Sequence, residues 1–396
     1  MGRIDVSSVV GGGAGVVVSE GLPKEVWIAI NTTWNVFNFR RSLIAALSES
    51  GFRVAAYAAP DEYIGRVEAG GARYVPMQLN NAGTHPLREL MTLWRMVRLL
   101  ALERPALLLT YTPKVNIYLA LAARVWGIPV VANVSGLGRT FIAGGWLTRV
   151  ARVLYRIAFS WPRCIFFQNA EDRTVFLDAG LVKVEQTALL PGSGVDVSRF
   201  APRPKVQDGG GFVFLMVARL TWDKGVGEYV AAARQLKTEF PGVSFRLLGF
   251  LDVPSPSAVS RDEVEAWVSE GLIEYLGHSD DTVSIYAESD CVVLPSYREG
   301  MPRTLLEAAS MGLPAIATDV PGCRQAVVDG ETGFLCRARD ATALARAMQR
   351  MLLLTFEQRA KMGNAARARI RREFDEKIVV ERYLDVVKAI LGEQHR

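Results

Sequence analysis

The chain has 396 residues, enough for two domains of ordinary size, and half of them are hydrophobic, so a large core can form. Its net charge of +5 is uneven: residues 1–200 carry 21 Lys or Arg and 14 Asp or Glu (+7), and the remainder carries 25 and 27 (−2). The four cysteines and three histidines show no metal-ligand or disulfide spacing. No apolar run is long enough to span a bilayer, and nothing resembles a nucleic-acid-binding module, so we expect no nucleic-acid partner.

Residues 1–23 are expected to form a flexible extension. The segment Gly11–Gly15 is rich in glycine, which also suits a phosphate-binding loop. No clear strand precedes it and Pro23 interrupts the segment after it, so the flexible extension is favoured.

From Glu25 onward, short apolar runs alternate with helical patterns, which is typical of a mostly parallel sheet covered on both faces. Pro, Gly and charged residues over 202–211 predict a linker, after which the alternation starts again. The fold class is therefore α/β, with two doubly wound parallel-sheet domains at 24–200 and 201–374 and a C-terminal helix at 375–396 that returns to the first. The predicted helices of the first domain are 37–50, 61–69, 86–102, 115–126, 146–159 and 170–179; those of the second are 225–240, 261–270, 282–287, 303–311 and helical sequence from 340.

One strand, loop and helix in the second domain carries two carboxylates. The strand at 290–294 leads to a loop containing Glu299 and Gly300, and the helix after that loop contains Glu307. Gly300 lets a ligand approach the backbone, the first-turn amides favour an anion, and a carboxylate on such a helix can accept two ribose hydroxyls. The unit suits a nucleotide, although two glutamates at this spacing also occur by chance on solvated surfaces.

The run Glu299-Gly-Met-Pro-Arg-Thr-Leu-Leu-Glu-Ala308 resembles the motif of the family 4 glycosyltransferases, which have the two-domain GT-B fold of Rossmann-like domains. The resemblance covers nearly the whole chain from Val26. It implies that Glu307 binds ribose and that Glu299 meets the donor sugar. The same resemblance places further donor contacts at Gly300, Met301, Pro302, Arg303 and Thr304, and near the nucleotide base at Gly249 and Leu276.

Arg219 and Lys224 follow the first strand of the second domain, with four residues between them and a glycine after the lysine. A lone Arg and Lys are usually only surface charges. In the family that this pattern resembles, these cations hold the donor diphosphate and stabilise it as it leaves, without a metal. We therefore expect Glu299, Arg219 and Lys224 to be catalytic, with no metal and no cofactor besides the nucleotide-sugar substrate. His278 is expected to face solvent or the base rather than to act as a catalytic base.

Three segments of the first domain resemble the subgroup that builds capsule, O-antigen and lipid-linked glycans on polyprenyl diphosphate. They start at Thr33, Thr110 and Ala132, and two depart from the family pattern. Trp34-Asn35 stands where many members have Gly-Gly, and Ser135 stands where many have a histidine, so Ser135 either binds a sugar or forms the turn. The resemblance implies acceptor contacts at Asn35, Asn38, Arg40, Lys114, Asn116, Ser135, Gly136 and Arg139.

A basic amphipathic helix is predicted at Trp146–Trp161. Arg149, Arg152 and Arg156 share one face, and an apolar stripe forms another. Such a helix either packs its stripe on the sheet or lies at an anionic membrane surface. The apolar stripe consists of Trp146, Val150, Val153, Leu154, Ile157 and Trp161.

The sequence thus predicts a retaining, metal-independent glycosyltransferase. It would move a sugar from a nucleotide sugar, a UDP-hexose or UDP-N-acetylhexosamine, to a polyprenyl-diphosphate-linked saccharide. It would work in the cytoplasm at the inner face of the cell membrane. A sugar-nucleotide 2-epimerase of the same fold and a non-catalytic nucleotide-sugar-binding partner remain the alternatives.

Overall fold

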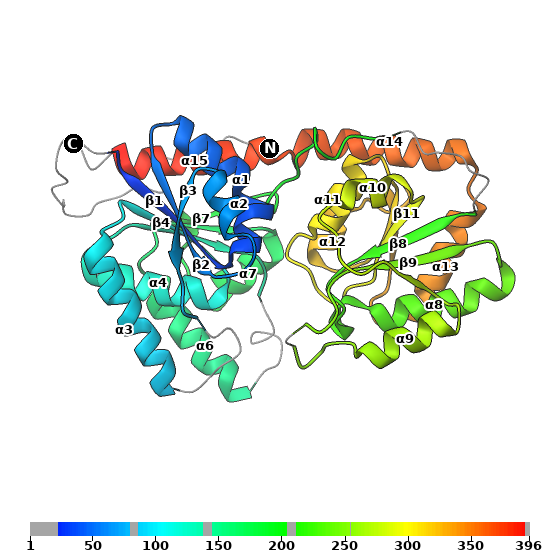
Figure 1. Cartoon of the computed structure of the whole chain (residues 1–396), viewed down its shortest axis with the longest axis horizontal. Coiled ribbons are helices and arrows are strands. Elements are labelled where there is room, and N and C mark those ends of the chain that lie inside the picture. Colours follow the sequence, from blue (N-terminus) through cyan, green and yellow to red (C-terminus); the bar gives the residue numbers. More distant parts are fainter. Residues whose placement is uncertain (1–22, 80–85, 138–144, 204–210, 254, 393–396) are drawn as a thin grey trace. The chain divides into compact units, whose positions relative to one another are not determined.

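A computed structural model describes residues 23–79, 86–137, 145–203, 211–253 and 255–392 (Figure 1). The chain divides into two compact units: unit 1 runs to Ser193 and resumes at Lys377, and unit 2 is Gly194–Glu376. The domain borders expected from the sequence, at 200/201 and 374/375, lie seven residues after the first division and two before the second. Among the described helices, none has the length and apolar character needed to cross a bilayer.

Unit 1 is built on a seven-stranded parallel sheet in the order β3-β2-β1-β4-β5-β6-β7 (Figure 1). The strands are β1 Glu25–Thr32, β2 Arg53–Ala59, β3 Ala72–Pro76, β4 Leu107–Tyr111, β5 Val130–Val134, β6 Cys164–Phe167 and β7 Thr187–Leu189. The helices are α1 Thr33–Glu49, α2 Ile64–Ala69, α3 Pro86–Glu103, α4 Pro113–Trp126, α6 Gly145–Ala158, α7 Ala170–Asp178, the 3₁₀ turn η2 Val184–Gln186 and the C-terminal α15 Glu376–Gly392.

Alternate residues of β1 enter different cores, as a strand covered on both faces requires. Val26 and Ile28 share a cluster with the apolar side of α1 and with Tyr383 of α15. Trp27 and Ala29 face the other way, into a cluster with α3 and α4. The C-terminal helix therefore completes the core of unit 1.

Two helix starts differ by three or more residues from the sequence prediction. α1 begins at Thr33, four residues earlier than expected, because Thr32 caps it by accepting a hydrogen bond from the Asn35 amide at 3.2 Å. The Asp61 carboxylate also accepts from the Trp34 amide at 2.9 Å and from the amide of Tyr63, also at 2.9 Å. Because Asp61 serves that turn, α2 starts at Ile64 rather than at residue 61.

Unit 2 has a six-stranded parallel sheet in the order β10-β9-β8-β11-β12-β13. The strands are β8 Val213–Val217, β9 Ser244–Leu248, β10 Glu274–Tyr275, β11 Cys291–Leu294, β12 Ala315–Thr318 and β13 Gly333–Cys336. The helices are the 3₁₀ turn η3 Trp222–Lys224, α8 Val226–Glu239, α9 Arg261–Ser269, α10 Thr282–Ala287, α11 Arg303–Ser310, α12 Pro321–Ala326, α13 Ala341–Leu353 and α14 Phe356–Glu373. The two parallel sheets confirm the predicted α/β fold, whereas α12 was not predicted.

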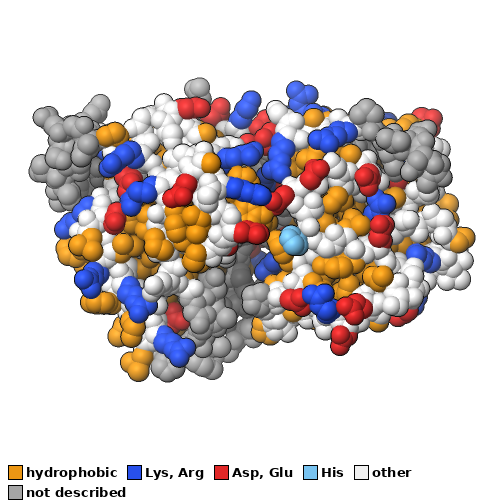
Figure 2. Space-filling view, in the orientation of Figure 1, with side chains coloured by type: hydrophobic (Ala, Val, Ile, Leu, Met, Phe, Trp, Pro, Cys, Tyr) orange, Lys and Arg blue, Asp and Glu red, His pale blue; other side chains and the backbone are white. Residues whose placement is uncertain are grey.

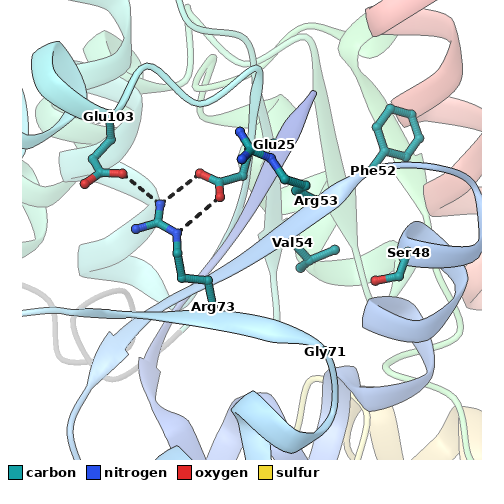
Figure 3. Close-up of a pocket in the computed structure, with 8 residues that line it drawn as sticks. All are labelled: Glu25, Ser48, Phe52, Arg53, Val54, Gly71, Arg73 and Glu103. Carbon is teal, nitrogen blue, oxygen red and sulfur yellow. Dashed lines mark hydrogen bonds and ion pairs between the residues drawn. The ribbon is translucent and has the colours of Figure 1, made fainter. Parts of the chain in front are cut away.

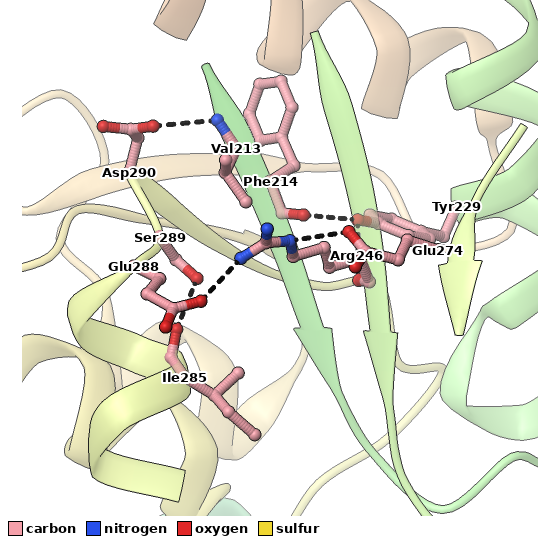
Figure 4. Close-up of polar contacts among 9 residues, drawn as sticks. All are labelled: Val213, Phe214, Tyr229, Arg246, Glu274, Ile285, Glu288, Ser289 and Asp290. Atoms are coloured by element: carbon pink, nitrogen blue, oxygen red, sulfur yellow. Dashed lines mark hydrogen bonds and ion pairs between the residues drawn. The ribbon is translucent and has the colours of Figure 1, made fainter. Parts of the chain in front are cut away.

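The amino ends of the unit 2 strands are joined by polar contacts (Figure 4). Arg246 of β9 forms ion pairs with Glu274 at 2.8 Å and with Glu288 at 3.1 Å. The Tyr229 hydroxyl of α8 lies 3.0 Å from the Phe214 carbonyl oxygen and 3.1 Å from that of Arg246, so it ties the helix to two strands. This edge is stabilised by the protein's own charges.

Candidate functional site

The loops after β8 and β11 bring two of the three predicted catalytic residues, Lys224 and Glu299, into contact. Lys224 Nζ lies 2.5 Å from Glu299 Oε1, and the two side chains are only 16% and 12% exposed. The Tyr297 amide donates to the Asp223 carbonyl oxygen at 2.9 Å, which fastens one loop to the other. Arg219 is exposed on the same loop as Lys224, and no ion pair to its guanidinium is seen among the described residues. These two cations lie at the carboxyl edge of the sheet, and this is the edge at which an open α/β fold binds its ligands.

Gly225 lets these two loops approach. Its φ of +78° is left-handed, and a Cβ atom at this position would lie 2.2 Å from the Pro295 carbonyl oxygen. A side chain there would push the loop with Lys224 away from Glu299. Steric contact with the neighbouring loop therefore explains why a glycine, Gly225, follows Lys224.

Glu307 lies near the middle of α11 with both carboxylate oxygens engaged. Arg303 Nε donates to Oε1 at 2.8 Å, and the Tyr286 hydroxyl donates to Oε2 at 3.0 Å. The Thr304 hydroxyl donates to the Val217 carbonyl oxygen at 3.1 Å, which fixes α11 against the end of β8. Burial, and next the charge of Glu307, raise the pKa of Tyr286 well above its usual value, so Tyr286 stays a hydrogen-bond donor.

The loop that carries Glu299 also rests on α12. A Cβ atom on Gly322 would lie 2.3 Å from the Gly300 carbonyl oxygen, and the Gly322 amide donates to the Glu299 carbonyl oxygen at 3.3 Å. Pro302 caps α11 without a side-chain hydrogen bond. Gly300, Met301 and Pro302 thus lie between two helix starts, where an anion would be favoured.

Gly249 and Leu276 lie in neighbouring loops of the same edge. The Gly249 amide donates to the Gly277 carbonyl oxygen at 2.7 Å, and the Leu276 amide donates to that of Leu247 at 2.9 Å. A Cβ atom on Gly249 would lie 1.7 Å from the Ala218 carbonyl oxygen, so only glycine lets this loop reach the one with Arg219. The ring of His278 stacks on Phe250 at 4.8 Å between ring centres.

In unit 1, Arg40, Asn116 and Ser135 converge on Asn133 and its neighbours. Asn116 Nδ2 donates to the Asn133 backbone oxygen at 2.8 Å, and the Ser135 hydroxyl donates to the Asn133 side-chain oxygen at 3.1 Å. Asn133 Nδ2 in turn donates to the Tyr383 hydroxyl of α15 at 2.9 Å. Ser135 is exposed and Asn133 is buried, so the network runs from the surface into the core.

Arg40 is 4% exposed and lies at the inner end of this cluster. Its guanidinium carbon is 4.0 Å from the centre of the Tyr111 ring, and Nη1 donates to the Phe39 carbonyl oxygen at 3.0 Å. Buried Arg40 and Asn116 can therefore influence an acceptor only through the residues they hold.

The remaining predicted acceptor residues lie apart. Asn35 donates to the side chains of Asn31 and Thr32, and Asn38 donates to the Trp34 carbonyl oxygen at 3.0 Å, so both contact their own helix start. Lys114 Nζ forms an ion pair with Glu89 at 2.9 Å. Gly136 follows Ser135 with a φ of +146°, and Arg139 lies outside the described residues.

Unit 1 also has a pocket at the opposite edge of its sheet (Figure 3). Arg73 bridges Glu25 at 2.9 Å and Glu103 at 2.7 Å, and these residues lie at the amino ends of strands or at a helix end. Ligands of open α/β sheets bind at the carboxyl ends. We therefore place the candidate site at the loops described above and not at this pocket.

Sequence reasoning missed five residues of these two clusters. Tyr286, Tyr111, Asn133, Gln168 and Tyr383 are buried and lie in apolar or mixed runs, which resemble ordinary core segments. Gln168 belongs to the unit 1 cluster because its Nε2 donates to the Asn133 side-chain oxygen at 3.4 Å. Of these, Tyr383 is separated from Asn133 by 250 positions. Only the folded arrangement shows that the C-terminal helix reaches this cluster.

Comparisons with known proteins agree for both halves of the chain. Residues 198–369 match the family model of glycosyl transferases group 1, and residues 38–192 match that of the glycosyl transferase 4-like domain. An N,N'-diacetylbacillosaminyl-diphospho-undecaprenol alpha-1,3-N-acetylgalactosaminyltransferase from Campylobacter jejuni is 26% identical over 90% of this chain and 96% of its own length. A UDP-Gal:alpha-D-GlcNAc-diphosphoundecaprenol alpha-1,3-galactosyltransferase from Escherichia coli is 27% identical over 71% of this chain and 74% of its own.

Solved structures share the fold. The crystal structure of HepE from Anabaena in complex with UDP-glucose superposes with a TM-score of 0.77 at 19% identity, covering 92% of this chain and 100% of its own. The sucrose-phosphate synthase of Thermosynechococcus elongatus gives 0.75 at 20% identity, covering 93% of this chain and 100% of its own.

Proposed function

Because this chain belongs to the family 4 glycosyltransferases with the GT-B fold, we propose that it transfers a sugar from a nucleotide sugar to a lipid-linked saccharide. The names of two relatives support the acceptor, since both refer to undecaprenyl-diphosphate-linked sugars. One of them also names UDP-galactose as its donor. We therefore propose a UDP-hexose or a UDP-N-acetylhexosamine as the donor.

The ion pair between Lys224 and Glu299 at the carboxyl edge of the sheet carries this proposal, with Arg219 on the same loop as Lys224. Lys224 and Arg219 hold the donor diphosphate and neutralise the charge that develops on it as the sugar leaves. Glu299 faces the donor sugar, and Glu307, with both oxygens fixed by Arg303 and Tyr286, accepts the ribose hydroxyls. The transfer retains the anomeric configuration and uses no metal ion.

Ligand-induced thermal stabilisation tests the donor. We expect one UDP-sugar out of a panel of UDP- and GDP-sugars to raise the unfolding temperature of the wild type and to do so less in Lys224→Ala. A product assay with a polyprenyl-diphosphate-linked sugar must then show an elongated acceptor, and this activity should survive EDTA. An epimerised nucleotide sugar without acceptor elongation would contradict the transferase, and loss in EDTA that magnesium or manganese restores would contradict metal independence.

We also propose that α6 contacts anionic lipids at the inner face of the cell membrane. Arg149, Arg152 and Arg156 are all exposed on it, and each could gain about 1 kcal/mol near anionic lipid. In a vesicle sedimentation assay, binding should fall with salt and in an Arg149/Arg152/Arg156→Glu variant. Wild-type protein that ignores anionic vesicles at low salt would contradict this contact.

A further inference from the structure

Three side chains of the apolar stripe of α6 do not pack on the sheet as those of an ordinary surface helix would, whereas Leu154 packs against the core. Val150, Val153 and Ile157 are 46%, 57% and 49% exposed. The core is met instead by Tyr155 and Ala158, which are buried. Trp161 lies beyond the end of the helix and donates from Nε1 to the Ile128 carbonyl oxygen at 2.8 Å, so it belongs to the core and not to the stripe. The side chain of Trp146 lies outside the described residues.

Because successive turns repeat every 3.6 residues, the exposed side of α6 has two adjacent stripes. Arg149, Arg152 and Arg156 occupy one, and the exposed Val150, Val153 and Ile157 occupy the next. No carboxylate forms an ion pair with these arginines among the described residues, and no acidic residue occurs between 104 and 170.

α3 repeats this arrangement on the same face of the sheet. α4 packs between α3 and α6, and both outer helices begin at the carboxyl edge of the sheet (Figure 1). Leu87, Leu90, Met91 and Trp94 form an exposed stripe on the first half of α3; Leu90 is 66% exposed and Trp94 58%. Figure 2 shows hydrophobic and basic side chains together over the part of the molecule that α3 occupies in Figure 1.

The charges beside the α3 stripe are also basic. Arg88 and Arg95 are exposed, and the Arg98 guanidinium lies 5.7 Å from the Trp94 ring centre. The two acids of α3 are both paired, Glu89 with Lys114 at 2.9 Å and Glu103 with Arg73 at 2.7 Å. The exposed surface of α3 is therefore apolar along its stripe and basic beside it.

We infer that α3 and α6 form a two-helix surface that inserts its apolar stripes into the interface of an anionic lipid bilayer. The positive charge favours a lipid bilayer as the partner of this surface, because arginines beside an apolar stripe match lipid phosphates beside acyl chains. Seven of the fourteen large apolar side chains that the described residues expose lie in the stripes of α3 and α6, so exposed apolar surface is concentrated on these two helices and not scattered. This inference rests on the proposed function, since insertion of the two helices would hold the carboxyl edge of unit 1 near a lipid-linked acceptor.

Insertion is tested by a pair of matched double variants. Leu90→Glu/Trp94→Glu alters the α3 stripe, and Leu353→Glu/Phe356→Glu alters two side chains of unit 2 that are 71% and 67% exposed. Full-length protein is sedimented with vesicles of equal parts phosphatidylcholine and phosphatidylglycerol, without donor or acceptor. We expect the α3 variant to lose at least tenfold in vesicle affinity and the unit 2 variant to bind like the wild type. Equal binding of both variants, with matching unfolding temperatures, overturns the inference.

A second measurement separates insertion from attraction by charge. All four native cysteines are buried, so a cysteine at an exposed position can be labelled selectively. A polarity-sensitive dye on Met91→Cys should shift its emission to the blue on adding these vesicles, and the same dye on Leu353→Cys should not. No shift at position 91 while the protein sediments would show adsorption without insertion and overturn the inference.

The remaining occupant of such a stripe is a second copy of the chain. If the wild type forms a dimer without lipid that Leu90→Glu/Trp94→Glu dissociates, the stripe is a protein interface and the inference is wrong. None of these measurements involves sugar transfer, so a negative result leaves the proposed reaction standing. Failure to transfer sugar would likewise leave vesicle binding unaffected.

Discussion

The candidate sites of the two units differ in how their polar groups are partnered. In unit 2, charges face charges: Lys224 pairs with Glu299, and Arg303 pairs with Glu307. In unit 1, the described cluster around Asn133 consists of amides and hydroxyls, and its cation, Arg40, stacks on Tyr111. Paired charges suit a charged nucleotide, whose diphosphate can take over a cation, whereas neutral amides and hydroxyls suit the hydroxyls of a sugar.

Charge alone does not distinguish a site from a structural cluster. Arg73 with Glu25 and Glu103, and Arg246 with Glu274 and Glu288, are ion-pair groups of the same kind (Figures 3 and 4). They lie toward the amino ends of strands or, for Glu103 and Glu288, at the C-terminal ends of helices, on the edge where an open sheet does not bind ligands. The position along the strand, rather than the presence of ions, separates Lys224–Glu299 from these groups.

The largest expected effect is that of Lys224→Ala. Removing the cation leaves the leaving diphosphate less neutralised, so turnover should fall by roughly a hundredfold or more while the protein remains folded. Steady-state kinetics measures the loss, and calorimetry should show weaker nucleoside-diphosphate binding. Lys237→Ala, a lysine on α8 of the same unit, is the control and should keep full activity. A folded Lys224→Ala enzyme with normal turnover would remove Lys224 from the mechanism.

A smaller effect should separate the two glutamates. Glu307→Gln should weaken UDP and UDP-sugar alike, by about tenfold, because a charge-assisted hydrogen bond to the shared ribose is lost. Glu299→Gln should affect the sugar-bearing donor alone. Calorimetry with both ligands measures the difference. If each variant weakens UDP and UDP-sugar equally, the two roles are wrongly assigned.

The strands, the parallel sheets and the unit 2 charges were predictable because each leaves a local pattern. Buried strands such as Cys291–Leu294 are apolar runs, and Glu299 with Glu307 stand at a recognisable spacing. The confirmed GT-B fold follows from those patterns together with the family resemblance. The residue roles remain predictions.

The features that escaped prediction depend on contacts between distant segments. The start of α1 is set partly by Asp61, 27 positions from the Trp34 amide that it accepts from. The orientation of α6 was left open by the sequence for a different reason, since its pattern is amphipathic whichever side faces the core. Tyr155 decides the orientation, because its ring packs on Phe159 and Phe176 at 4.8 and 5.2 Å between ring centres.

Substitutions of two buried tyrosines test whether the cluster around Asn133 in unit 1 contributes to acceptor binding. Tyr383→Phe leaves the buried Asn133 amide without its partner, which should cost about 1–2 kcal/mol of unfolding free energy. It should also raise KM for the acceptor, because Asn133 holds Ser135. Tyr229→Phe removes a comparable buried hydroxyl in unit 2 and should lower stability without changing that KM. Equal acceptor KM values in both variants would make Tyr383 purely structural.

The smallest expected effect concerns acid stability at the pocket of unit 1. Burial by itself raises the pKa of Glu25, but hydrogen bonds from Arg73 and Trp27 and the charges of Arg73 and Arg53 outweigh it, so the pKa lies below its usual 4.5. A carboxylate with a lowered folded-state pKa stabilises the protein above its unfolded-state pKa, and this contribution is lost as the pH falls through the folded value.

Glu25→Gln removes that contribution, so its unfolding temperature should lie slightly below the wild-type value at neutral pH. The two should converge in acid, below the usual pKa of 4.5. Thermal unfolding across this pH range measures the convergence, with Glu265→Gln on α9, an exposed glutamate, as the control that should track the wild type at every pH. A constant difference between Glu25→Gln and wild type down to the lowest pH would mean that packing, and not the charge of Glu25, stabilises this edge. The Arg73 cluster would then differ from the Lys224–Glu299 pair in having no electrostatic role.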